Sequence, residues 1–173
     1  AQIVHLIADN KDAYAIQRAS KHKIDYTVIE SKKYSREDFE IHTLKVLQNK
    51  KVDVIVLAGF MRILTSKFIN SYKNKIINIH PSLLPSFPGA HAHRDTISYG
   101  AKISGCTVHL VDEGVDTGPI IMQASLQVDE NETEETLSQK ILPLEHELLP
   151  RALELFCSKK LKIDGRNVSI ITD

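Results

Sequence analysis

Short apolar runs alternate with helical patterns along this chain, and only a few folds accommodate that order. Residues Gln2–Ala8 and Tyr26–Ile29 are rich in the residue types that favour strands. Val52–Ala58 is the most continuous apolar run and is typical of a central parallel strand that is covered on both faces. A turn and helix cap at Asp9–Asn10, and a helix from about Ser35, separate these runs. We therefore predict an α/β fold in which helices flank a doubly wound, mostly parallel sheet of the Rossmann type.

Glycine and proline delimit the elements in the second half of the chain. Gly59 ends the central strand, and the prolines of residues 81–94 exclude both helix and sheet there. The helical pattern of Glu132–Phe156 is interrupted by Pro143 and Pro150, which predicts two helices or one kinked helix. The other expected elements are helices at 65–72 and 93–99, strands at 76–80, 106–111 and 119–128, and an edge strand within 161–173.

Length and composition exclude several classes of protein. A chain of 173 residues fits one domain with a substantial core, so we expect a single domain over residues 1–173. The 22 basic and 22 acidic residues cancel, which argues against nucleic acid and membrane partners. The two cysteines, Cys106 and Cys157, are expected to be reduced, buried thiols. No apolar run is long enough to cross a membrane and the start does not resemble a signal peptide, so we expect a cytoplasmic protein.

Polar side chains cluster where the strand at residues 76–80 ends. Asn78 and His80 are followed by a proline-rich loop that must be extended. The later strand Cys106–Val111 leads into a turn whose glycines and proline hold Asp116 in a defined loop. Taken singly, these are ordinary turn residues: a cap, a loop histidine before proline and a turn-stabilising aspartate. In combination, Asn78, His80 and Asp116 are available to one cleft.

Four motifs in the same order carry a resemblance to a known family. They are Leu57–Leu64, Asn78–Pro85, Pro88–Gly89 with His91 and His93, and Val115–Pro119 with Gln123. Together they resemble the folate-dependent formyltransferases, and the similarity extends more weakly over nearly the whole chain. The residues around His80 favour the branch of the family whose acceptor is phosphoribosylglycinamide, in purine biosynthesis. The resemblance implies 10-formyltetrahydrofolate as co-substrate and no metal.

The resemblance also implies a set of site residues. The catalytic residues would be Asn78, His80 and Asp116. Folate contacts would come from Phe60, Met61, Arg62, Ile63, Leu64, Asn78, Val111, Asp112, Gly114, Val115 and Asp116. Acceptor contacts would come from Ile79, Pro81, Gly89, His109 and Glu145, with Thr107 and His109 orienting the site. Purely structural roles stay open for some of these residues. The apolar residues of 60–64 could belong to the core, Arg62 could form a surface salt bridge, and Glu145 could lie on a solvated helix face.

The residue types fit the chemistry of formyl transfer. The tetrahedral intermediate carries negative charge on oxygen and positive charge on the attacking nitrogen, so it needs hydrogen-bond donors and a route for protons. Asn78 can donate from its amide, and a protonated His80 can donate as well. Asp116 can hold that imidazole in its charged form and order a water that accepts the amine proton. No nucleophilic side chain is required, because the acceptor amine attacks directly.

Other interpretations remain open at this point. His80, His91, His93 and His109, with Asp116, could form a metal site, although no short Cys or Glu ligand pair accompanies them. A formyltetrahydrofolate hydrolase, a methionyl-tRNA or sugar formyltransferase, or a non-catalytic folate-binding fragment would share part of the pattern. The oligomeric state is open between monomer and homodimer.

The resemblance departs from the family pattern at the start of the chain. Relatives open with an additional strand and a Gly-Ser-Asn loop at a helix start, where backbone amides grip the phosphate of the substrate. This sequence has no glycine before Gly59. The resemblance therefore implies a domain that lacks the first strand and the phosphate loop, with a weaker grip on the ribonucleotide and a less stable sheet.

Overall fold

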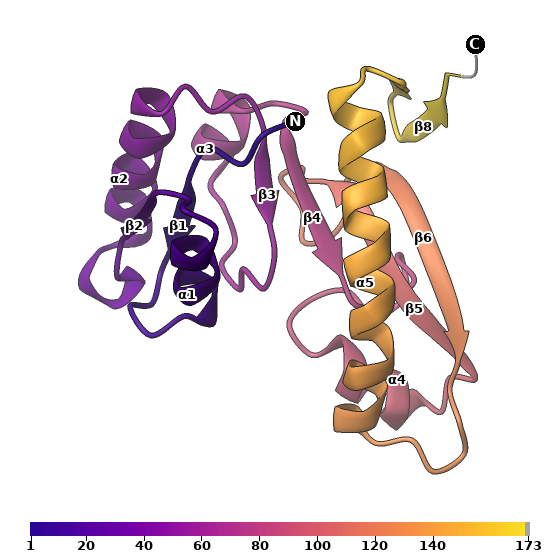
Figure 1. The fold of residues 1–173 in the computed structure, drawn as a ribbon. Coiled ribbons are helices and arrows are strands. Elements are labelled where there is room, and N and C mark those ends of the chain that lie inside the picture. The colour runs from indigo at the N-terminus through magenta and orange to yellow at the C-terminus, as the bar shows by residue number, and fades with distance from the viewer. Residues whose placement is uncertain (172–173) are drawn as a thin grey trace. The chain divides into compact units, whose positions relative to one another are not determined.

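The computed structural model describes residues 1–171, and the chain divides into two compact units (Figure 1). The smaller unit comprises residues 1–53 and 64–68. The larger comprises residues 54–63 and the chain from residue 69 onward. The expectation of a single domain over residues 1–173 stays a prediction.

The smaller unit contains two short parallel strands and two α-helices. Its elements are β1 (Leu6–Ala8), α1 (Tyr14–Lys21), β2 (Tyr26–Val28), the 3-10 helix η1 (Ser31–Lys33) and α2 (Arg36–Asn49). The helix predicted from Ser35 is present, and the Ser35 hydroxyl caps it by accepting a hydrogen bond from the Asp38 amide at 3.1 Å. Phe39 and Leu47 are buried on its inner side, as the sequence pattern predicts.

Two predictions about the start of the chain are only partly right. The strand expected over Gln2–Ala8 is confined to Leu6–Ala8, because β2 provides only three paired residues, and Ile3 is 70% exposed. The turn at Asp9–Asn10 exists, since the Asn10 side chain accepts a hydrogen bond from the Asp12 amide. It does not cap the helix, however: α1 begins after Ala13, which makes no side-chain cap.

The larger unit is built on a four-stranded mixed sheet in the order β3-β4-β5-β6. β3 is parallel to β4, and β5 is antiparallel to both β4 and β6, so three of the four strands run in one direction. The helix α3 (Ser66–Ser71) contains residues of both units. The other elements of the larger unit are β3 (Ile55–Leu57), β4 (Ile76–His80), α4 (Ala92–Tyr99), β5 (Ile103–Leu110), β6 (Ile120–Gln127), α5 (Glu134–Cys157), β7 (Leu161–Asp164) and β8 (Asn167–Ile170). α4 corresponds to the helix predicted at 93–99, and Gly100 ends it in the left-handed conformation.

Side chains alternate between the two faces of this sheet, and the alternation separates the core from the polar residues. Ile77 on β4 and Cys106, Val108 and Leu110 on β5 are buried against α5, which runs along the sheet in Figure 1. From α5 the buried core includes Leu137, Ile141, Leu148 and Ala152. Asn78, His80, Thr107 and His109 occupy the intervening positions and therefore lie on the opposite face.

Three further expectations for this unit need correction or refinement. The predicted central strand Val52–Ala58 is the short strand β3, which has one partner among the described residues, and its Val56 is 41% exposed. The pattern of Glu132–Phe156 forms one continuous helix despite its two prolines, started by a capping box at Thr133. The tail forms a separate hairpin, β7 with β8, and not an edge strand of the main sheet; residues 172–173 lie outside the described part.

Candidate active site

The register of β4 and β5 brings four polar side chains together on one face of the sheet. Asn78 is paired with His109, and His80 is paired with Thr107. The Asn78 Nδ2 atom lies 3.2 Å from Nε2 of His109, whose Nδ1 donates to the Leu110 carbonyl at 2.9 Å. In the neutral ring, Nε2 of His109 is therefore the acceptor for the Asn78 amide, which fixes the orientation of that amide.

The loop between β5 and β6 delivers Asp116 to this cluster. Asp116 adopts a left-handed backbone conformation with φ of 54°, which aspartate tolerates better than most residues. The Asp112 carboxylate organises the loop, because it accepts hydrogen bonds from the Gly114 amide at 3.1 Å and the Thr117 hydroxyl at 2.6 Å. Gly118 is required sterically, since a Cβ there would lie 1.7 Å from the Leu110 carbonyl oxygen.

Asp116 lies between two histidines. Its Oδ2 is 3.3 Å from Nδ1 of His80, and its Oδ1 is 3.6 Å from Nε2 of His109. The Gly89 amide donates to the same Oδ2 at 2.8 Å. The other ring nitrogen of His80 donates to the Phe87 carbonyl at 2.9 Å. Both ring nitrogens of His80 thus face oxygen acceptors, and only the doubly protonated imidazolium can donate to both.

This arrangement keeps Asp116 ionised. The contact with the His109 ring is the main cause that lowers the pKa of Asp116, from 3.8 to about 2, and the Gly89 amide and the charge of His80 lower it further, against the effect of partial burial. A carboxylate with so low a pKa does not retain a proton at neutral pH. It is suited to orienting an imidazole and a water molecule by accepting their hydrogen bonds.

Comparison with known proteins identifies the family. The family model described as formyl transferase matches residues 1–153. The chain belongs to the formyl transferase family. The phosphoribosylglycinamide formyltransferase of Bacillus subtilis (strain 168) is 43% identical over 150 residues, which are 86% of this chain and 77% of that protein. The resemblance stated above is thereby confirmed.

Two further relatives define the fold and the extent of the match. The crystal structure of glycinamide ribonucleotide transformylase 1 from Symbiobacterium toebii has a TM-score of 0.96 and 42% identity, and the match covers 99% of this chain and 81% of that one. The predicted fold class is confirmed by this likeness. The trifunctional purine biosynthetic protein adenosine-3 of Chironomus tentans is 42% identical over 167 residues, 96% of this chain. This formyl transferase chain spans only 12% of the length of that relative.

The segments predicted to bind folate lie mostly in the larger unit of this formyl transferase. Phe60–Ile63 follow β3, and Met61 and Ile63 are 73% and 56% exposed, so they are available to a ligand. Leu64 is buried and belongs to the smaller unit. The other predicted folate residues are in the loop that carries Asp116: Val111, Asp112, Gly114 and Val115.

The structure places two predicted acceptor residues away from the polar cluster. Ile79 packs against the core beneath α5. Glu145 lies on α5, where burial raises the pKa of its carboxyl group, and its charge helps burial raise the pKa of the Cys106 thiol to about 11. Because Cys106 faces α5, Glu145 lies on the side of the sheet opposite to Asn78 and His80. Pro81 and Gly89 flank the cluster in the proline loop, where the Gly89 amide binds Asp116.

Sequence reasoning missed three residues of the formyl transferase that support the cluster. The Ser82 hydroxyl is fully buried and donates to the Ser86 carbonyl at 2.5 Å. Gln123 donates to the Leu84 carbonyl and to the Thr107 hydroxyl, both at 2.9 Å. Arg166, in the β7–β8 turn, donates to the Thr117 carbonyl at 2.7 Å. The available signals were the place of Gln123 in one of the four motifs and a serine inside a proline-rich loop, where it can satisfy a carbonyl.

His91 and His93 do not join His80 and His109 in one metal site. His91 is exposed before α4, whereas His93 is half-buried and burial lowers its pKa. Within residues 1–171 there is no group of three or more His, Cys, Asp or Glu residues placed to hold a metal ion. That the protein uses no metal remains a prediction. Among the described residues, none of the helices has the length and apolar character needed to cross a bilayer.

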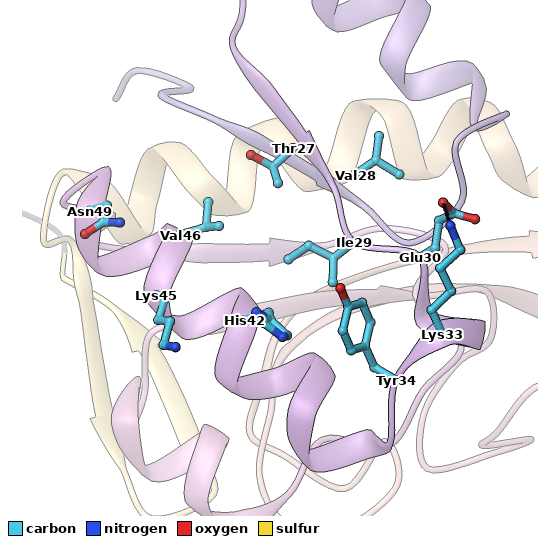
Figure 2. Close-up of a pocket in the computed structure, with 10 residues that line it drawn as sticks. All are labelled: Thr27, Val28, Ile29, Glu30, Lys33, Tyr34, His42, Lys45, Val46 and Asn49. Atoms are coloured by element: carbon cyan, nitrogen blue, oxygen red, sulfur yellow. Dashed lines mark hydrogen bonds and ion pairs between the residues drawn. The ribbon is translucent and has the colours of Figure 1, made fainter.

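A cavity of about 300 Å³ lies in the smaller unit (Figure 2). It lies between β2 and α2, with Ile29 and Val46 among its apolar residues and Tyr34, His42 and Lys45 among its polar ones. Lys33, which also lines it, is paired with Glu30 at 2.6 Å. The cavity contains none of the residues predicted for the formyl transferase site.

Proposed function

We propose that this chain transfers the formyl group of 10-formyltetrahydrofolate to the amine of 5'-phosphoribosylglycinamide, a step of de novo purine biosynthesis. The observation that carries the proposal is Asp116 held between His80 and His109, with the Asn78 amide bound to His109. The two relatives named above after phosphoribosylglycinamide and glycinamide ribonucleotide support the same acceptor.

The reaction requires one bond to form, one to break and one proton to move. The acceptor amine attacks the formyl carbon and gives a tetrahedral intermediate with negative charge on oxygen. The bond from this carbon to the folate nitrogen then breaks, and the proton lost by the amine is delivered to that nitrogen. A catalyst must therefore stabilise the oxyanion and relay one proton.

Each side chain of the cluster has a role in this scheme. Asn78 uses one N–H on His109 and has a second N–H for the oxyanion. His80, protonated between the Phe87 carbonyl and Asp116, places a positive charge beside the same oxygen. Asp116 orients the water that takes the amine proton and passes it to the leaving nitrogen. Thr107 holds the proline loop by a hydrogen bond to the Ser82 carbonyl, and His109 orients Asn78 and Asp116.

The binding roles follow the same proposal. The exposed residues of Phe60–Ile63, with the backbone of residues 111–116, would hold the folate. Pro81 and Gly89, which flank the cluster, would contact the acceptor. Ile79 and Glu145, expected in the same role, lie toward α5 and would contribute only from that side of the sheet. Leu64, which is buried, would support the folate loop and not touch the ligand.

The deciding experiment follows loss of the formyl group from 10-formyltetrahydrofolate, with and without phosphoribosylglycinamide. We expect turnover that depends on the amine, and we expect Asp116→Asn to lower it by about 100-fold or more. Asp164→Asn is the matched control, because the same change is made at an exposed side chain at the end of β7.

Two outcomes would contradict the proposal. Loss of the formyl group at the same rate with and without phosphoribosylglycinamide would identify a hydrolase. Binding of a folate analogue without any formyl loss would identify a binding module.

A further inference from the structure

We propose that Ser82 is a positioning residue for His80 and Asp116, and that it acts through the backbone of residues 86–89. The inference deepens the proposed function and rests on it for the catalytic roles of His80 and Asp116. The residues concerned all belong to the larger unit.

The turn at residues 86–89 binds both members of the pair. The Phe87 carbonyl accepts a hydrogen bond from Nε2 of His80 at 2.9 Å, and the Gly89 amide donates to Oδ2 of Asp116 at 2.8 Å. Two backbone groups only two residues apart thus hold the imidazole and the carboxylate. The geometry of this turn therefore fixes the separation and orientation of the pair.

The turn is strained and needs an external tether. Phe87 has a φ of 52°, a left-handed conformation that is costly for a bulky side chain. The fully buried Ser82 hydroxyl donates to the Ser86 carbonyl at 2.5 Å and lies 3.2 Å from the Phe87 carbonyl. The Ser82 hydroxyl thus binds the carbonyl groups on both sides of the strained Phe87 Cα atom. Without it, the orientation of the Phe87 carbonyl toward His80 loses its support.

Ser82 is itself fastened to the sheet. The Thr107 hydroxyl, on β5, donates to the Ser82 carbonyl at 2.7 Å and accepts from the Leu84 amide at 3.1 Å. Gln123, on β6, donates to the Leu84 carbonyl and to the Thr107 hydroxyl. A site held by rigid strands is more precise than one held by a loop alone. Gln123 is therefore the second positioning residue, connected to His80 through Thr107, Ser82 and the Phe87 carbonyl.

The kinetic test compares Ser82→Ala with Ser86→Ala in the full chain. Both changes remove one hydroxyl from the same loop, but the Ser86 side chain is exposed. We expect Ser82→Ala to lower kcat by about tenfold while KM for 10-formyltetrahydrofolate stays within about twofold, because only the orientation of the pair is disturbed. Ser86→Ala should leave both constants unchanged. Gln123→Met, which removes both donors at similar size, should lower kcat in the same way.

A second readout does not depend on activity. In ¹⁵N-resolved NMR spectra, the Nε2–H proton of His80 should be visible and slow to exchange in the unmodified chain and in Ser86→Ala. It should be lost to exchange in Ser82→Ala and Gln123→Met. If the unmodified chain transfers no formyl group, the proposed function fails, whereas this comparison still decides on the positioning.

Two results would overturn the positioning role. One is a His80 Nε2–H signal that persists unchanged in Ser82→Ala. The other is a normal kcat in both Ser82→Ala and Gln123→Met. Thermal melting identifies a variant that fails to fold, and in that case the comparison of Gln123→Met with the unmodified chain decides the matter.

Discussion

Asp116 is the residue whose environment most affects how the molecule responds to pH. Its folded pKa of about 2 lies below the ordinary value of 3.8, so on acidification the unfolded chain takes up this proton first. The stabilisation from its contacts is complete above about pH 4 and is lost as the pH falls toward 2. The full shift corresponds to roughly 2 to 3 kcal/mol of unfolding free energy, since one pKa unit is about 1.4 kcal/mol, and most of it is lost by about pH 2.

Urea unfolding at a series of pH values measures this contribution. We expect the free energy of unfolding to fall by about 2 kcal/mol more in the unmodified chain than in Asp116→Asn between about pH 5 and about pH 2. Asp164→Asn should follow the unmodified chain. Parallel curves for the unmodified chain and Asp116→Asn would mean that the hydrogen bonds to Asp116 contribute nothing to folding.

Among the elements, α5 contains an unusual feature in its two internal prolines. Pro143 is exposed and provides no N–H for the carbonyl of Gln139, so one hydrogen bond of the helix is missing. Proline in a helix interior costs about 3 kcal/mol relative to alanine, and about 1 kcal/mol of this is offset because proline also restricts the unfolded chain. Pro143→Ala should therefore raise the free energy of unfolding by about 2 kcal/mol.

Chemical denaturation checks this value against Pro88→Ala. Pro88 is exposed in an irregular loop, so its replacement should lower the stability slightly by loosening the unfolded chain. Opposite signs for the two prolines are the expected pattern. A destabilised Pro143→Ala variant would show instead that the ring contributes packing that the helix needs.

Elements defined by local signals were predictable, and those defined by distant partners were not. The strand at 76–80, the helix cap at Ser35 and the αL glycine at residue 100 follow from nearby residues. The run at 52–58 is as apolar as a central strand, but it forms three residues of strand because only β4 pairs with it among the described residues. The tail pairs with itself because Gly165 permits a tight turn there, a choice that no apolar pattern reveals.

The candidate site was predictable in the same uneven way. Asn78, His80 and Asp116 carry reactive groups and stand in the motifs that carry the family resemblance. The structure brings them into one chain of contacts through His109. Ser82 and Gln123 act on backbone carbonyls, and such partners depend on the loop path and not on residue type. The position of Glu145 on the other face depends on how α5 packs, which the sequence alone leaves open.

At the scale of the molecule, one sheet serves two purposes in the larger unit. One face carries the polar cluster, and the other is sealed by α5 over an apolar core. Because the residues of both faces alternate along the same strands, the core fixes the register that aligns Asn78 with His109. Opening the layer beneath α5 should therefore dismantle the site as well as the core.

The thiols offer a direct probe of that opening. Cys106 lies within the core, as expected, and burial is the main cause that raises the pKa of its thiol from 9.0 to about 11. The expectation of a buried thiol is wrong for Cys157, which is exposed near the end of α5. The thiolate is the reactive form, so the raised pKa alone slows alkylation of Cys106 by about 100-fold, and burial blocks it further.

In the native protein, iodoacetamide should modify Cys157 and spare Cys106, as peptide mass spectrometry would reveal. In a Cys157→Ala variant, modification of Cys106 should rise only with the urea concentration that unfolds the chain, in parallel with loss of formyl transfer. Rapid modification of Cys106 under native conditions, with the activity intact, would show that α5 can leave the sheet without disturbing the site.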